Sequence, residues 1–218
     1  MAKTIAVLGG TGNEGPGLAR LWAKSGQYKV IIGSRQAEKG QRVAAELNEQ
    51  LGKNLIEGMA NEDAARAANL CVLTVPYSAQ GPILTALIDL LQGKILVDVT
   101  VPLKPPKVAR VNVPAGGSAG QEAQAILGDG VRVVSAFQNV GAAHLAEGGD
   151  HIDCDVLVCG DDKEAKAEAI ALAEAAGMRG IDAGPLQNAV VIEGLTSVLI
   201  GINIRNKVKG AGIKITGI

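Results

Sequence analysis

The sequence predicts an α/β protein with a doubly wound, mostly parallel sheet and a small C-terminal α/β extension that ends in a long apolar helix. Thr4–Gly15 is an unbroken apolar run that ends in glycines and leads into a helix, the usual start of such folds. After it, short runs of Val, Ile and Leu alternate with segments of helical periodicity. Near the end, Pro185–Asn206 is apolar on nearly all sides, which predicts a helix buried on more than one side.

The glycines of the first loop, Gly10, Gly12 and Gly15, have the G-x-G-x-x-G spacing, and they follow a predicted strand that is apolar on both faces. In this motif the first glycine permits a tight turn, and the second lets a pyrophosphate approach the backbone. The third allows close packing between helix and strand. The alternative is an ordinary glycine-rich turn, but the strand and helix around the motif favour a Rossmann-type site for a dinucleotide.

The elements of the first half follow from periodicity and from turn residues. Gly26 ends a helix over Gly17–Ser25 whose Leu18, Leu21 and Trp22 face the sheet, and Gly52 ends the next helix. Asn61 is the expected N-cap of a third helix. The predicted segments are the strands Lys29–Gly33, Leu55–Ile56, Leu70–Val75 and Ile95–Val99 and the helices Glu38–Leu51 and Glu62–Ala68.

The second half continues the pattern after a long polar loop, Lys104–Gly120. Ser118 and either Asp161 or Asp162 are expected to cap helices, and Glu193 is expected on the exposed face of the final helix. The predicted segments are the strands Val131–Ala136, Val156–Cys159 and Arg179–Asp182, the helices Ala119–Leu127 and Lys163–Ala176, and a short last strand within Lys207–Ile218.

Composition limits the classes of function. The chain has 218 residues, 47% of them hydrophobic and 20% charged, with a formal net charge of -1, so no overall basic field favours nucleic acid or an anionic membrane. No apolar run is expected to reach membrane-spanning length, and a strand is expected directly after Met1, so we expect a cytoplasmic protein. Cys71, Cys154 and Cys159 lack metal-type spacing and predict buried thiols in a reducing compartment without a metal site.

The residues after the second predicted strand indicate which dinucleotide binds. Proteins that prefer NAD place an acidic residue there, whereas this chain has Ser34 and Arg35, followed by Lys39. A hydroxyl and a guanidinium suit the ribose phosphate of NADP. The alternative is a solvated pair of cations at the start of a helix, where the helix dipole disfavours them. The sequence therefore predicts NADP in preference to NAD.

Two later strands end in the same phrase, Thr-Val-Pro, with Val75-Pro76 in one and Val101-Pro102 in the other. Taken singly, each proline is a strand terminator. Because ligands bind at the carboxyl ends of strands in open α/β sheets, the two phrases together predict walls of a nicotinamide site.

With these pieces in place, the chain resembles the NADPH-dependent reductases of the deazaflavin coenzyme F420, nearly from end to end. The resemblance rests on six short sequence motifs. The first two, GGTGNEG and GSR, occur in many dinucleotide folds, whereas VCGDD and DAGPL are more specific in combination. The phrases are GGTGNEG at Gly9–Gly15, GSR at Gly33–Arg35, NEDAA at Asn61–Ala65, TVP at Thr74–Pro76, VCGDD at Val158–Asp162 and DAGPL at Asp182–Leu186.

The resemblance implies two adjacent sites. For NADP(H), it places the pyrophosphate, the ribose phosphate and the nicotinamide on residues Thr11, Gly12, Asn13, Glu14, Ser34, Arg35, Lys39, Val75 and Pro76, and Gly10 of the glycine motif is also expected to bind the cofactor. For coenzyme F420, it places the ring beneath Val101, Pro102, Gln138, Asn139 and Val140. Glu14 stands where an apolar residue is more usual, and Gln138 stands where archaeal members tend to have His.

The implied reaction is hydride transfer between NADP(H) and coenzyme F420, in which the protein positions two rings and excludes water. Asn139 is the one candidate for a catalytic side chain, and Lys104, Lys107, Lys207 and Lys209 are candidate contacts for the acidic tail of F420. Residues 1–150 are expected to form the NADP-binding domain. Residues 151–218 are expected to complete the acceptor site and to contribute to a homodimer contact.

Two other functions remain open at this point. One is an NADPH-dependent reductase of a flavin, ferric ion or other small acceptor such as an imine. The other is a non-catalytic NADP(H) sensor whose long helix meets a partner.

Overall fold

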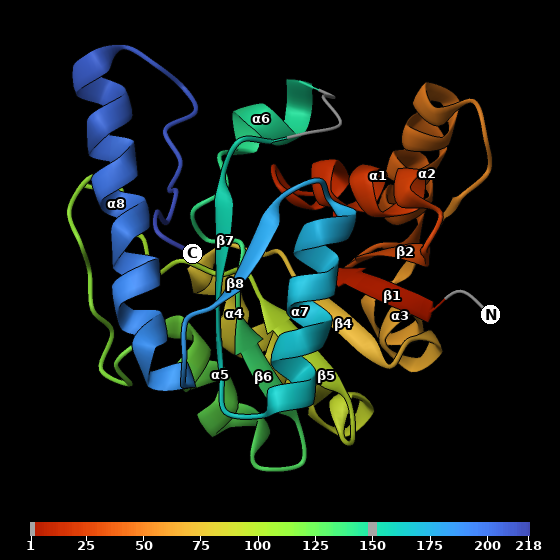
Figure 1. Cartoon of the computed structure of the whole chain (residues 1–218). Coiled ribbons are helices and arrows are strands. Elements are labelled where there is room, and N and C mark those ends of the chain that lie inside the picture. Colours follow the sequence, from red (N-terminus) through yellow and green to blue (C-terminus); the bar gives the residue numbers. More distant parts are fainter. Residues whose placement is uncertain (1–2, 148–151) are drawn as a thin grey trace.

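The computed structural model describes residues 3–147 and 152–218, in which eight strands form one sheet (Figure 1). The strand order is β3-β2-β1-β4-β5-β6-β7-β8. The strands from β1 to β6 pair in parallel, β7 is antiparallel to β6, and β8 is parallel to β7. The predicted doubly wound, mostly parallel sheet is therefore confirmed. The bounds are β1 (Lys3–Leu8), β2 (Tyr28–Ser34), β3 (Ile56–Ala60), β4 (Leu70–Leu73), β5 (Ile95–Asp98), β6 (Arg132–Ser135), β7 (Asp155–Gly160) and β8 (Arg179–Asp182).

Helices cover both faces of the sheet, because strand residues that are apolar at every position must be buried on two sides. In β1, Ile5 and Val7 pack on one face with α1 (Gly15–Ser25), α2 (Ala37–Leu51) and α7 (Lys163–Ala175). Ala6 and Leu8 pack on the other face. The helices of that second face are α3 (Asn61–Ala67), α4 (Tyr77–Leu91), α5 (Ala119–Leu127) and α8 (Ala189–Asn206).

Most predicted elements lie within a few residues of the observed ones, but α4 and α6 (Ala142–Glu147) were not predicted. In α4, Gly81 and Pro82 interrupt the helical pattern. Because apolar residues lie on most sides of this helix, its sequence alternates only weakly between an apolar and a polar face. Helix α6 is a single short element within a segment that the sequence indicates only as a loop.

The predicted last strand within Lys207–Ile218 is wrong, since the segment has no strand assignment. The tail instead crosses the start of β7, where the carbonyl of Ile213 accepts a hydrogen bond of 2.8 Å from the N–H of Asp155. The Asp155 carboxylate accepts from the N–H of Ile215, and Arg179 donates to the Ile215 carbonyl. A backbone hydrogen bond together with side-chain hydrogen bonds therefore holds the tail in place of a strand ladder.

The segment formed by η1 (Leu186–Asn188) and α8 is long and apolar enough to cross a membrane by length and composition, with a mean hydropathy of 1.3. The expectation that no apolar run reaches spanning length is therefore wrong. One such helix is weak evidence for a membrane, since core helices pass the same test. Here α8 packs against α5 at one flank of the molecule (Figure 1).

The sheet continues from β6, which lies in the first predicted part of the chain, into β7 and β8, which lie in the second. The predicted boundary between residues 150 and 151 lies outside the described residues.

Candidate functional site

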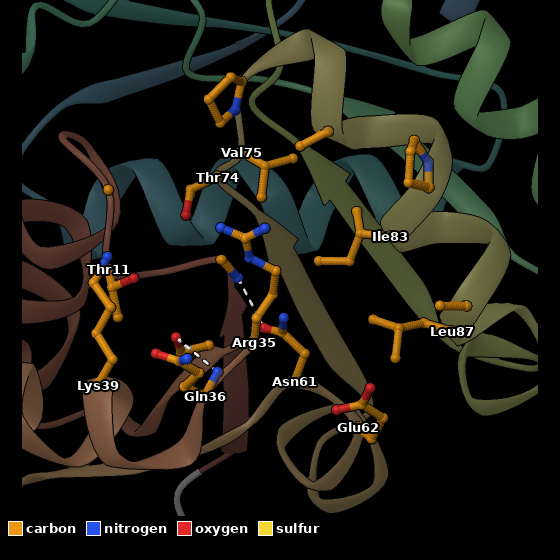
Figure 2. Close-up of a pocket in the computed structure, with 17 residues that line it drawn as sticks. Thr11, Arg35, Gln36, Lys39, Asn61, Glu62, Thr74, Val75, Ile83 and Leu87 are labelled. Atoms are coloured by element: carbon orange, nitrogen blue, oxygen red, sulfur yellow. Dashed lines mark hydrogen bonds between the residues drawn. The ribbon is translucent and has the colours of Figure 1, made fainter.

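A cavity of about 860 Å³ opens at the carboxyl ends of β1, β2 and β4, the edge at which open α/β sheets bind ligands. Its lining has four parts: the glycine loop, the residues after β2, the start of α3 with Asn61 and Glu62, and the end of β4 with one side of α4 (Figure 2). Of the predicted site residues, the cavity brings together Thr11, Gly12, Ser34, Arg35, Lys39, Val75 and Pro76.

The tight turn after β1 depends on Gly9 rather than on Gly10, which corrects the sequence prediction. Gly9 has a φ of +66°, in the left-handed region, and a Cβ there would lie 2.2 Å from Cγ1 of Val75. Its N–H donates a hydrogen bond of 3.0 Å to Oδ1 of Asn61. The prediction that the side chain of Asn61 caps α3 is therefore wrong. Asn61 directly follows β3, and its side chain instead fixes the glycine loop.

Gly12 and Gly15 are glycines for different reasons. A Cβ on Gly15 would lie 2.6 Å from Cα of Gly10, so the third glycine allows α1 to pack against the loop, as predicted. Gly12 is exposed, and a Cβ there would meet no described protein atom closer than the Thr74 carbonyl at 3.7 Å. The missing side chain at Gly12 thus leaves open space in front of the loop, which is where the motif predicts a pyrophosphate.

Arg35 and Lys39 enter the cavity from the end of β2 and the start of α2. Within residues 3–147 and 152–218, neither side chain has an ion pair or a hydrogen bond. Figure 2 shows the guanidinium of Arg35 directed toward Thr74 and Val75. Two cations without protein partners at the mouth of one cavity suit an anionic ligand.

Val75 and Pro76 line the cavity at the end of β4, as the Thr-Val-Pro phrase predicts. The sequence did not indicate the apolar wall beside them, because it lies on the unpredicted helix α4. This wall faces Arg35 in Figure 2 and is suited to a flat aromatic ring. It consists of Ala79, Pro82, Ile83, Ala86 and Leu87.

Gly10, Asn13 and Glu14 belong to the glycine loop but do not line the cavity. Gly10 is buried, and its N–H donates to the carbonyls of Val7 and Gly33, so it joins β1 to β2. Glu14 is partly buried, and burial raises the pKa of its carboxyl to about 7.

The other predicted residues lie outside this cavity, in the loops after β5 and β6, on the same edge of the sheet. These residues are Val101, Pro102, Gln138, Asn139 and Val140. Gln138 is buried, and its Nε2 donates to the carbonyl of Asp98 at 2.8 Å and to Oγ of Ser135 at 2.7 Å. Gln138 is therefore held by the ends of β5 and β6.

Asn139 points toward α8. Its Nδ2 donates to the carbonyl of Ile192 at 2.9 Å and to Oγ1 of Thr196 at 3.2 Å. Oγ1 of Thr196 in turn donates to the carbonyl of Gln138 at 2.8 Å. Oδ1 of Asn139, Oε1 of Gln138 and Oγ1 of Thr100 are buried without a hydrogen-bond partner among the described residues, so this edge carries unused polar capacity.

Two buried carboxyls lie behind these loops. Asp98 at the end of β5 is 0% exposed, accepts from the N–H of Thr100 and from Nε2 of Gln80, and has a pKa that burial raises to about 6. Glu193 is 1% exposed, so its expected place on the exposed face of α8 is wrong. The spacing within α8 does not separate the faces, because the helix is apolar on nearly all sides.

Two of the predicted helix caps and the predicted buried thiols are found as expected, whereas the cap predicted at Asn61 is not. Oγ of Ser118 accepts from the N–H of Gln121, and Oδ1 of Asp162 accepts from that of Ala165. The three cysteines are buried and free, and Cys154 and Cys159 pack on opposite faces of the sheet.

Comparison with known proteins agrees with this geometry. Residues 4–102 match the model of a family described as NADP oxidoreductase, coenzyme F420-dependent. The F420-dependent NADP reductase of Methanothermobacter thermautotrophicus is 42% identical over 225 residues, covering 100% of this chain and 97% of that protein. The F420-dependent NADP reductase of Methanocaldococcus jannaschii is 43% identical over 222 residues, covering 98% of both.

A crystal structure from Arthrobacter sp. FB24, of a protein assigned as an F420-dependent NADP reductase, superposes with a TM-score of 0.80 at 30% identity. It covers 98% of this chain and 99% of that one. The chain is thus similar over its full length to these proteins, and it belongs to the family of coenzyme F420-dependent NADP oxidoreductases.

Proposed function

We propose that this chain transfers a hydride between NADP(H) and coenzyme F420, with NADP(H) bound in the cavity at the ends of β1, β2 and β4. One observation carries the placement: Arg35 and Lys39 have no described protein partner and stand beside Ser34 opposite the open face of Gly12. A phosphate on the ribose would supply the negatively charged partner for these two cations, and the N–H groups of the loop would face the pyrophosphate.

The apolar wall on α4 provides the surface on which the adenine packs, with the Arg35 guanidinium able to stack on the opposite side. Val75 and Pro76 limit the nicotinamide on the side of β4. Thr11 and Asn13 stay close to the pyrophosphate. Each group of this lining thus matches a different part of one dinucleotide.

The deazaflavin ring binds beside the nicotinamide, at the loops after β5 and β6 that carry Val101, Pro102, Gln138, Asn139 and Val140. Sheet order supports this placement, since β5 and β6 follow β4 directly along the same edge. A second support is that Oε1 of Gln138 and Oδ1 of Asn139 have no hydrogen-bond partner among the described residues. Asn139 is proposed to orient the ring, whereas the neighbouring N–H of Val140 already donates to the carbonyl of Phe137 at 3.1 Å.

The residues around the two sites would hold the nicotinamide and the deazaflavin so that a hydride could pass from the reduced ring to the oxidised one. The protein holds the two rings in contact, excludes water and presents fixed dipoles to the changing charge. Asn139 is therefore proposed to act by placement and polarity rather than as an acid or a base.

The test is an absorbance assay of NADPH oxidation with coenzyme F420, FMN and FAD compared side by side, repeated with NADH. Turnover that requires F420 and prefers NADPH supports the proposal. Equal turnover with FMN or FAD favours a reductase of flavins or other small acceptors. Nucleotide binding without turnover with any acceptor favours a sensor.

We also propose that the chain forms a homodimer through the uncovered side of α8, where Val191 is 63% and Val198 is 44% exposed. The buried free cysteines favour a reducing compartment, the cytoplasm. Residues 151–218, which supply α8, are proposed to complete the acceptor site begun by residues 1–150. Light scattering of the wild type and of Val198→Lys tests the dimer, since the lysine is expected to give monomers.

A further inference from the structure

Glu193 joins two helices that are far apart in sequence. Its Oε2 accepts a hydrogen bond of 2.7 Å from the N–H of Ala119, and its Oε1 accepts one of 3.0 Å from the N–H of Gly120. These are the first two residues of α5, whose N–H groups have no partner within the helix. Together with the Ser118 side chain, which accepts from Gln121, the carboxylate satisfies the start of α5.

The same turn of α8 holds the loop after β6. The carbonyl of Ile192, next to Glu193, accepts from Asn139, and Thr196, one turn further on, binds both Asn139 and the carbonyl of Gln138. One turn of α8 is therefore fixed to α5 on one side and to the Gln138–Asn139 loop on the other. If the first attachment shifts, the second shifts with it, because both come from one rigid helix.

A further connection closes this network from the side of β5. Nε2 of Gln80 bridges Oδ2 of Asp98 and the carbonyl of Ala119, the residue whose N–H binds Glu193. Gln138 binds the carbonyl of Asp98. The ends of β5 and β6, the start of α5 and the middle of α8 thus form one continuous set of buried hydrogen bonds.

We propose that Glu193 is a positioning residue for the acceptor: its two hydrogen bonds to α5 set the place of α8 and, through Asn139 and Thr196, that of the loop on which coenzyme F420 binds. The inference rests on the proposed acceptor site. Glu193 lies outside both proposed substrate sites, yet this role makes it necessary for the binding of coenzyme F420 and not for that of NADP(H).

The charge state of Glu193 makes this role measurable. The ionised carboxylate accepts both N–H groups, whereas a protonated one turns an O–H toward its surroundings and loses acceptor capacity. Burial raises the pKa of Glu193 to about 7, the two N–H bonds oppose that rise, and the nearby Asp98 adds to it. Glu193 also interacts electrostatically with Tyr77 on α4 and with Cys159 on β7, and the pKa values of both groups are raised.

The experiment compares wild type, Glu193→Gln and the control Glu49→Gln, an acid-to-amide change on the exposed side of α2. For each protein, the KM for F420 is measured from pH 5.5 to 8.5, and the Kd of NADPH is measured by fluorescence titration. Loss of one N–H partner predicts about a 3- to 10-fold higher KM for F420 in Glu193→Gln at pH 8. The Kd of NADPH stays within about twofold of the wild-type value, since the amide lies outside the proposed NADP cavity.

The pH profile separates positioning from a general loss of structure. In wild type the KM for F420 is expected to rise as the pH falls through 7, and in Glu193→Gln this change is expected to disappear. A pH dependence that belongs to F420 itself persists in the variant and overturns the proposal. An unchanged KM, or an equal loss of NADPH binding, also overturns it.

Val101→Trp in the same assay shows whether a failure concerns Glu193 or the acceptor site. If Val101→Trp abolishes F420 turnover and Glu193→Gln changes nothing, the role of Glu193 is wrong and the site stands. If Val101→Trp also leaves turnover intact, the proposed acceptor site itself is wrong.

Discussion

The ring of Trp22 in α1 meets the ring of Phe137 edge-on, with the centroids 5.8 Å apart and the planes at 81°. Phe137 has a φ of +74°, an unusual backbone conformation for a bulky residue, and it directly precedes Gln138 and Asn139. Trp22 is itself fixed by a hydrogen bond of 2.8 Å from its Nε1 to the carbonyl of Leu172. Packing between two aromatic rings thus keeps the acceptor loop in a conformation that its sequence alone disfavours.

Phe137→Ala is therefore expected to lower the free energy of unfolding by about 3–5 kcal/mol, as expected for a buried Phe, and to weaken F420 binding more than NADPH binding. Urea unfolding and the two binding constants check this. Trp22→Phe keeps an aromatic ring in place and serves as the milder comparison. Equal weakening of both ligands in Phe137→Ala would show that the ring does not act through the acceptor loop.

Gly12→Ala and Gly15→Ala are expected to differ in kind. A methyl group on Gly12 meets no described protein atom within 3.7 Å but enters the space proposed for the pyrophosphate, so NADPH binding falls while stability stays the same. A methyl group on Gly15 meets Gly10 at 2.6 Å, and overpacking of this kind costs about 1–3 kcal/mol of stability. Thermal unfolding with and without NADPH measures both effects. A Gly12→Ala protein that binds NADPH normally would contradict the proposed pyrophosphate position.

Arg35→Ser is expected to weaken NADPH binding by about 1.5–3 kcal/mol, the usual contribution of a hydrogen bond to a charged group, while NADH binding changes little. Arg35→Asp adds repulsion between the new carboxylate and the ribose phosphate of NADPH, so it is expected to shift the preference toward NADH more than Arg35→Ser does. The measurement is kcat/KM for NADPH and NADH in each variant. An unchanged preference would mean that Arg35 does not select the phosphate.

Three acids with raised pKa values give the stability of the protein a definite pH dependence. Burial raises the pKa of Asp98 to about 6 and the pKa values of Glu14 and Glu193 to about 7, so the folded state keeps protons that the unfolded state has already lost above about pH 4–5. The free energy of unfolding therefore falls as the pH rises from 5 to 8, by on the order of 1–3 kcal/mol for each group.

Asp155 and Asp182, whose pKa values are lowered by Arg179 and Lys166, act only at lower pH and do not disturb this window. Urea unfolding at pH 5 and pH 8 is the measurement, and Asp98→Asn and Glu193→Gln are each expected to reduce the loss. Stability that rises toward pH 8 in wild type would contradict these assignments.

What the sequence predicts well is what local pattern determines. The strand and glycine loop, the cap at Gly26 and the Ser34-Arg35 pair need only neighbours in sequence, and the structure has each of them where they were expected. Helix α4, with its apolar wall, was missed because Gly81 and Pro82 break the pattern that identifies a helix.

Contacts between segments that are distant in sequence could not be predicted from local sequence patterns. Asn61 looks like a helix cap until it is seen to bind Gly9, 52 residues away. Glu193 looks exposed until α5 is placed against it, 74 residues away in sequence. In both cases a polar side chain has a local explanation and a tertiary partner, and only the fold decides between them.

The central claim, that two rings meet at the ends of β4, β5 and β6, is tested most directly by Val101→Trp. The account predicts that the tryptophan occupies the place of the deazaflavin, so NADPH-dependent reduction of coenzyme F420 is lost while the Kd of NADPH stays at its wild-type value. Reduction of F420 at the wild-type rate by Val101→Trp would contradict it and place the acceptor elsewhere.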